Sequence, residues 1–163
     1  MSWIMPFSEK LITGHYGTLS EYRRKNGMQP HSGTDWAPKG KSPIPAIANG
    51  TVKLVQWSNV LGWVVVQTAA TKAKKIVHIG YCHLACDKHG VECKGPEAKC
   101  TTPFKVAVGQ KVEAGQPFGA KVGNTGSASS GSHLHATLGK GVKDVFGPTT
   151  AKQDLFKAIK DNA

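Results

Sequence analysis

Two histidines separated by a single leucine, His133 and His135, are the residues of this sequence best suited to chemistry. On a β-strand, residues two apart face the same side with Cα atoms about 6.6 Å apart, so both rings would enter one groove. A zinc ion bonds imidazole nitrogen at about 2.0 Å. Both rings could bind one metal ion, or one could bind while the other stands beside an open coordination position.

Three more residues complete the set that a catalytic zinc site needs. His31 precedes Asp35 by four residues. Pro30 and Gly33 favour a turn that leads into a strand, so the curvature of the loop would bring these two side chains together. His83 lies in the apolar run KKIVHIGYCHL. Such a site has three protein ligands and an open position for water, with neutral imidazoles nearby for proton transfer.

Short apolar runs divided by glycine and proline predict a mostly β protein that positions these residues. The chain has 163 residues, 19 glycines and 9 prolines, and 39% of it is hydrophobic, which fits one globular domain. Strands are predicted in PIPAIANGTVKLVQW, GWVVVQT, KKIVHIGYCHL and HLHATLG. In the third, alternation places Ile79, Tyr81 and His83 on one face. Cys82, on the opposite face, would be buried as a small apolar side chain.

We expect a single domain over residues 1–163, an antiparallel β-sandwich or roll with a groove for the histidines. Residues 1–30 form an irregular N-terminal segment with a short helical turn in TLSEYRRKN. Residues 85–104 are polar, carry three cysteines and are predicted to be an inserted surface loop. Residues 149–160 fit a C-terminal helix capped by Thr150 with an apolar stripe for packing.

The charge of the chain points to an anionic partner. Lysine and arginine number 21 against 10 acidic residues, for a net charge of +11, which attracts nucleic acid, membrane surfaces or cell-wall polymers. No nucleic-acid motif accompanies the spread lysines, so we expect no nucleic-acid binding. No apolar run approaches the roughly 18 residues of a membrane span, so no membrane insertion is expected. The first residues lack a secretion signal, which predicts synthesis in the cytoplasm.

Five motifs follow one another along most of the chain. They are HSGTDWAPKGKSPIPAIANGTV (31–52), WSN (57–59), GYCHL (80–84), VGQKVEAGQPFG (108–119) and VGNTGSASSGSHLHA (122–136). Their order resembles the lysostaphin/LytM type of zinc metalloendopeptidase, a family that cleaves the peptide part of bacterial peptidoglycan. The resemblance extends from about Ile12 to Leu138.

The resemblance implies a role for each of the five candidate residues. His31, Asp35 and His135 would bind a Zn²⁺ ion. His83 and His133 would be catalytic, removing the proton of the attacking water and passing it to the leaving amine; which of them is base or acid stays open. The implied reaction is hydrolysis of peptide bonds in stem peptides or cross-bridges, leading to cell-wall lysis. The bond that is cut also stays open.

Two positions of the family pattern, a tyrosine and an aromatic residue, are less clearly matched in this chain. The family has a tyrosine ahead of the first metal-binding histidine that reaches the oxyanion, and Tyr16 and Tyr22 are the candidates here, with Tyr22 the better placed. The family usually has an aromatic residue after the second histidine of HLH, whereas this chain has Ala136. We expect altered packing behind the strand and unchanged ligands.

The cysteine-bearing loop is the larger departure from the family. Cys86, His89, Cys93 and Cys100 together could bind a structural zinc ion, but their spacing fits no standard zinc ribbon. The favoured alternative is that one pair forms a disulfide and leaves an odd thiol, or that all three stay thiols. Because the loop follows His83 directly, we expect it to form one wall of the substrate groove.

These observations together favour an antimicrobial phage endolysin of a single domain. We expect a monomer that is made in the host cytoplasm, is released to act on the cell wall at lysis, and is concentrated there by anionic wall polymers. The alternative is a non-catalytic relative that binds peptidoglycan and regulates another hydrolase. Such relatives typically lack metal ligands, and this chain has all three.

Overall fold

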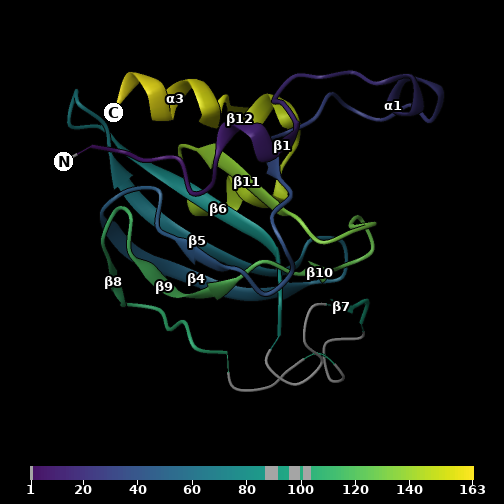
Figure 1. Ribbon diagram of the computed structural model, residues 1–163. Coiled ribbons are helices and arrows are strands. Elements are labelled where there is room, and N and C mark those ends of the chain that lie inside the picture. The colour runs from purple at the N-terminus through teal and green to yellow at the C-terminus, as the bar shows by residue number, and fades with distance from the viewer. Residues whose placement is uncertain (1, 87–91, 96–99, 101–103) are drawn as a thin grey trace.

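A computed structural model of the chain describes residues 2–86, 92–95, 100 and 104–163 (Figure 1). The strands of its main sheet are β1 (Ile12–Gly14), β2 (Thr34–Trp36), β4 (Gly50–Ser58), β5 (Gly62–Ala70), β6 (Ile76–Leu84), β8 (Lys111–Val112), β11 (Leu134–Gly139) and β12 (Lys152–Gln153). Two smaller pairs are β3 (Pro43–Pro45) with β9 (Pro117–Lys121), and β7 (Glu92–Cys93) with β10 (Asn124–Thr125). The predicted mostly β fold is confirmed.

The main sheet runs in the order β1-β2-β11-β6-β5-β4-β8, with β12 paired to the outer part of β11. Its described pairs are all antiparallel, as predicted. The small β7–β10 pair is parallel. Strands β2 and β11 are neighbours although about a hundred residues separate them in sequence, and this crossover brings the first and last motifs together.

Apolar side chains cover both faces of the central strands. A large cluster that includes Tyr81 and Leu84 fills one face. A smaller cluster on the other face joins Val64 and Cys82 to Val145 of the 3-10 helix η2 (Val142–Phe146). Cys82 is fully buried, as its position in the alternation predicts. Close packing on both faces makes the sheet rigid, so polar side chains can leave it only where the apolar clusters end.

The N-terminal segment is more ordered than the sequence predicts. It contains the 3-10 helix η1 (Glu9–Leu11) and the strand β1, which pairs with β2. The predicted helical turn is α1 (Glu21–Lys25), and the side chain of its N-cap residue Ser20 accepts a hydrogen bond from the Arg23 amide. In Figure 1 this helix projects away from the sheet.

The predicted C-terminal helix begins later than expected. Residues 149–153 form the 3-10 helix η3 (Thr149–Ala151) and then β12, because Lys152 and Gln153 pair with the end of β11. The helix α3 (Leu155–Asp161) is capped by Asp154, whose side chain accepts from the Lys157 amide, so Thr150 was the wrong cap. Its apolar stripe packs on the large cluster as predicted. None of the described helices is long and apolar enough to span a membrane.

Candidate metal centre and two neighbouring histidines

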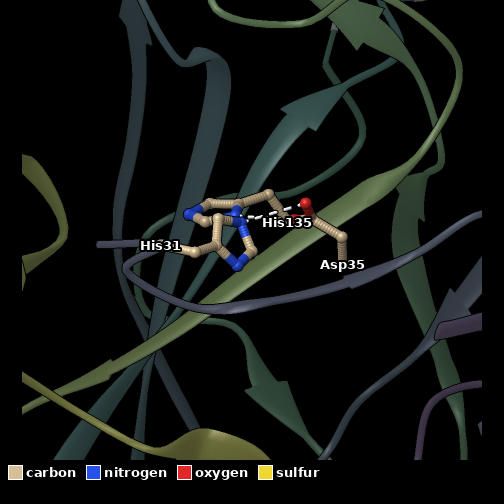
Figure 2. Close-up of side chains that lie close together, drawn as sticks. All are labelled: His31, Asp35 and His135. Atoms are coloured by element: carbon tan, nitrogen blue, oxygen red, sulfur yellow. Dashed lines mark hydrogen bonds and ion pairs between the residues drawn. The ribbon is translucent and has the colours of Figure 1, made fainter. Parts of the chain in front are cut away.

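The structure brings His31, Asp35 and His135 together at one end of the β2–β11 pair (Figure 2). His135 lies directly opposite Asp35 in the register of the two strands. Asp35 Oδ1 is 2.8 Å from His135 Nδ1, and Asp35 Oδ2 is 3.0 Å from His31 Nε2. The three potential ligand atoms all lie within 4.8 Å of one another. Sheet pairing thus places one carboxylate between two imidazoles.

Glycine at position 33 permits this close approach. A Cβ atom on Gly33 would lie 2.2 Å from the carbonyl oxygen of Ala136 and 3.0 Å from His135 Cε1. A residue with a side chain would therefore push the chain between His31 and Asp35 away from β11, because a contact with backbone cannot give way easily. Ala136 itself is fully buried in the large cluster, where a family member would carry an aromatic ring.

Further contacts orient the two rings of the metal centre. The Nδ1–H of His31 donates to the carbonyl oxygen of His15 at 3.1 Å, which leaves its Nε2 facing Asp35. The Nε2 of His135 lies 3.3 Å from Ser32 Oγ, which leaves its Nδ1 facing Asp35. Outer partners of this kind fix the ring orientation and the tautomer of a metal-binding histidine.

The electrostatics of the cluster favour an ionised Asp35 carboxylate. Burial alone would raise the pKa of Asp35, but hydrogen bonds and charge interactions with His135 and His31 outweigh it and hold that pKa far below its usual range. Burial lowers the pKa of His135. His31 and His135 are each only 7% exposed. Two imidazoles and one carboxylate are the donor set of a zinc site with three protein ligands, so these residues fit that metal.

His83 reaches this centre through a β-bulge, which the sequence did not predict. Its backbone has a φ of 61°, in the left-handed region that is uncommon for residues other than glycine. The β5–β6 register shifts there, and Leu84 rather than His83 packs with Tyr81. The prediction that His83 shares a face with Ile79 and Tyr81 was wrong, because a bulge interrupts the alternation and redirects a side chain. The His83 ring centroid lies 4.9 Å from that of His133.

Backbone carbonyls hold the rings of His83 and His133. The Nδ1–H of His83 donates to the Thr125 carbonyl at 2.7 Å, and that of His133 donates to the Gly131 carbonyl at 2.8 Å. Each ring then presents Nε2 as its acceptor nitrogen. Burial, followed by repulsion from the neighbouring imidazoles, lowers the pKa of His83 to about 3. The Nε2 of His133 lies 3.9 Å from Asp35 Oδ1.

A hollow of about 220 Å³ joins the five residues into one site. Its other lining residues are Arg23, Met28, Ser32, Leu61 and Ala128. A larger hollow of about 480 Å³ lies beside Trp3, away from the histidines. Its lining offers two exposed lysines and no histidine, cysteine or carboxylate, so we place the chemistry in the smaller hollow. Sequence reasoning missed Arg23 and Met28, since neither forms part of a motif.

Neither candidate tyrosine lines the hollow over the histidines. The hydroxyl of Tyr16 donates to the Lys152 carbonyl at 3.0 Å, which ties the N-terminal segment to β12. Tyr22 lies on α1 and is 70% exposed. The residues of the same segment that do line the hollow are Arg23 and Met28. The role of a tyrosine in catalysis therefore stays a prediction.

Two of the three loop cysteines form a disulfide and one stays a thiol, as the favoured alternative predicts. Cys93 and Cys100 form a disulfide with Cα atoms 5.8 Å apart, while Cys86 is a buried free thiol. This pairing rules out the four-ligand zinc site, because two of its ligands are bonded to each other. Most of the segment 85–104, including His89, lies outside the described residues.

Lys94 links the described part of that segment to residues that lie next to the site. Its Nζ donates to the carbonyl oxygens of Ser129 at 2.6 Å and Gly126 at 3.1 Å, and to Asn124 Oδ1 at 3.0 Å. The adjacent strand β7 pairs with β10, which supplies the carbonyl that holds His83. Sequence reasoning missed Lys94, because a lone loop lysine carries no signal of its long-range partners.

Several solved structures have a fold similar to that of this chain. No family model matches the chain. Among solved structures, the catalytic domain of the prophage-encoded M23 protein EnpA from Enterococcus faecalis is 27% identical, with 91% of each chain covered and a TM-score of 0.59. LytU is 26% identical over 99% of this chain and 94% of its own, with a TM-score of 0.64.

The catalytic domain of the antimicrobial peptidase lysostaphin from Staphylococcus simulans has the same fold. It is 23% identical over 90% of this chain and 89% of its own, with a TM-score of 0.61. The chain spans only 36% of a longer match, a zinc-containing peptidase from Vibrio cholerae. The chain therefore has the fold of the lysostaphin/LytM type of peptidase, with a His-Asp-His cluster fit to hold a metal ion at its centre.

Proposed function

We propose that the protein is a zinc-dependent endopeptidase that hydrolyses peptide bonds in the stem peptides or cross-bridges of bacterial peptidoglycan. The observation that carries this proposal is the grouping of two kinds of histidine in one hollow: two that share the Asp35 carboxylate, and two that backbone carbonyls hold with Nε2 available. The likeness to lysostaphin, a peptidase, supports it.

The metal and the protein would divide the chemistry between them. His31, Asp35 and His135 would hold a Zn²⁺ ion, which would supply a Lewis acid for the scissile carbonyl and lower the pKa of a bound water. His133 is suited to carry the water's proton to the leaving amine, since the Gly131 carbonyl holds its Nδ1–H and leaves Nε2 to accept that proton. His83 is held neutral by burial, so it can accept a hydrogen bond from the attacking water and orient it.

We also propose where the protein is made and where it acts. Similarity to a prophage-encoded protein supports a phage endolysin. The proposal includes synthesis in the host cytoplasm and release to the wall at lysis as a monomer. The net charge of +11 would concentrate it on anionic wall polymers. This attraction should weaken as salt is added, because screening shortens the range of charge interactions.

One experiment tests the enzyme directly. Purified peptidoglycan is incubated with the protein loaded with zinc and, in parallel, with chelator, and new termini are identified by mass spectrometry. We expect equal numbers of new amine and carboxyl ends with zinc and none with chelator. Absence of new ends with zinc present would refute the proposal, and binding without cleavage would instead favour a non-catalytic regulator.

A further inference from the structure

A second hollow continues the groove beyond the histidines. It measures about 330 Å³ and lies between the turn after β4 and the helix η2. It shares Ser32 and Leu61 with the hollow over the histidines, so the two form one groove. A peptide bond held at the metal centre would therefore leave the neighbouring substrate residue in this second hollow.

The walls of the second hollow are apolar and partly exposed. Val60 is 54% exposed and Phe146 is 38% exposed, while Leu61 and Val145 lie deeper. Exposed apolar side chains gathered around a concave site are typical of a binding surface. The lining therefore suits an aliphatic chain.

The charged side chain that lines this hollow is an unusual lysine. Lys152 is only 6% exposed, and its Nζ donates to the Gly147 carbonyl oxygen. Among the described residues, it forms no ion pair with a carboxylate. An ammonium group has three N–H donors and is almost never buried unless paired. Burial lowers the pKa of Lys152, and the charge of Asp144 offsets this only in part. An anion in the hollow would therefore further stabilise the charged ammonium group.

A third hollow adjoins the central one at other residues, and its lining differs from that of the second hollow. The third hollow, of about 320 Å³, shares Asp35, Ala128 and His133 with the central one. The rest of its lining is small or hydroxylated and carries no lysine or arginine: Thr13, Ala37, Ser130, Gly131 and Ser132. The two hollows therefore offer different surroundings, one small and uncharged, the other apolar with a buried cation.

We propose that the second hollow is a substrate subsite for a residue with an aliphatic side chain and a free carboxylate, and that Lys152 pairs with that carboxylate. This inference rests on the proposed function and names its substrate class: peptides with an acidic residue beside the scissile bond, rather than uncharged bridges alone. Lys152 is then a residue that determines specificity, and the metal centre does not depend on it.

The test compares two peptides that differ in one group. Both carry the same stem-peptide sequence, with a free carboxylate or its carboxamide at the residue next to the cleaved bond. For the wild type, kcat/KM should be at least about tenfold higher for the acid, corresponding to about 1.4 kcal/mol for one ion pair. Lys152→Met should bring the two values together by lowering only that of the acid, and Lys152→Arg should keep part of the preference.

The controls separate this role from a structural one. Lys143→Met removes the same charge from an exposed position of η2 and should leave the preference unchanged. If Lys152→Met does not fold, Val60→Glu places an anion at the exposed rim and should weaken cleavage of the acid selectively. Equal losses on both peptides, or a preference for the acid that survives Lys152→Met and Val60→Glu, would overturn the proposal.

The same two peptides test the subsite even if the protein is not a peptidase. If the wild type cleaves neither peptide, the equilibrium Kd of each uncleaved peptide is measured instead. Tighter binding of the acid that Lys152→Met abolishes would uphold the subsite without the peptidase activity. Equal Kd values for acid and amide in the wild type would refute the subsite.

Discussion

The two pairs of histidines in the groove are held in place by different parts of the structure. His31 and His135 share the carboxylate of Asp35, and the register of β2 against β11 sets His135 opposite it. His83 lies in a bulge, and His133 lies one residue before β11 begins. The main sheet therefore fixes the candidate ligands, whereas carbonyls of the short strand β10 and of the loop after it fix the candidate catalytic rings. Changes to the loops should affect turnover and leave metal binding intact.

The largest effect should come from breaking the first pair. His135→Ala removes one of three ligands and leaves the Asp35 carboxylate with one ring, so zinc affinity should fall by more than about 100-fold. Zinc content after dialysis and peptidoglycan hydrolysis should both drop to background. A variant that retains zinc fully would show that the His-Asp-His cluster is not the metal site.

The next effect should come from the second pair. His133→Ala and His83→Ala should each keep zinc while kcat falls by about 10²–10⁴-fold, the usual contribution of a general acid or base. Zinc content and kcat are measured on the same preparations. Metal loss equal to that of His135→Ala would mean that the two pairs are not separate.

A smaller effect should come from the segment that supports the second pair. Lys94→Met removes donors to Gly126 and Ser129, so the loop that carries the anchoring carbonyls can shift. We expect kcat to fall about tenfold, since a misplacement of about 1 Å can cost 100-fold, with zinc content unchanged. Lys94→Arg should restore part of the rate, and Lys105→Met, at an exposed position, is the matched control. Unchanged kcat would contradict the supporting role.

The smallest effect should come from Tyr22. This side chain is 70% exposed and does not line the hollow, so Tyr22→Phe should leave kcat/KM within about twofold, as for other surface substitutions. Steady-state kinetics of the two proteins decide this. A loss of tenfold or more would mean that α1 moves over the groove when substrate binds.

Residues that regular strands position could be predicted from the sequence, whereas residues that depend on a bulge or on distant contacts could not. Periodic apolar runs predicted the central strands, and ordered motifs pointed to the three residues that the β2–β11 pair brings together. The bulge at His83 escaped prediction because alternation assumes a regular strand, and the register shift depends on how β5 pairs with β6. The start of α3 was misplaced because β12 pairs with distant β11. Lys94 and Lys152 escaped because their significance lies in contacts far away along the chain.

Trp63 gives the molecule an internal optical probe. Its indole N–H donates to the Cys100 carbonyl at 3.1 Å, and its ring stacks on Phe104 with centroids 5.1 Å apart. Indole emission responds to the polarity and contacts around the ring, so opening of the disulfide beside it should change the fluorescence. Formation and reduction of this disulfide in the purified protein could then be followed in real time, without any label.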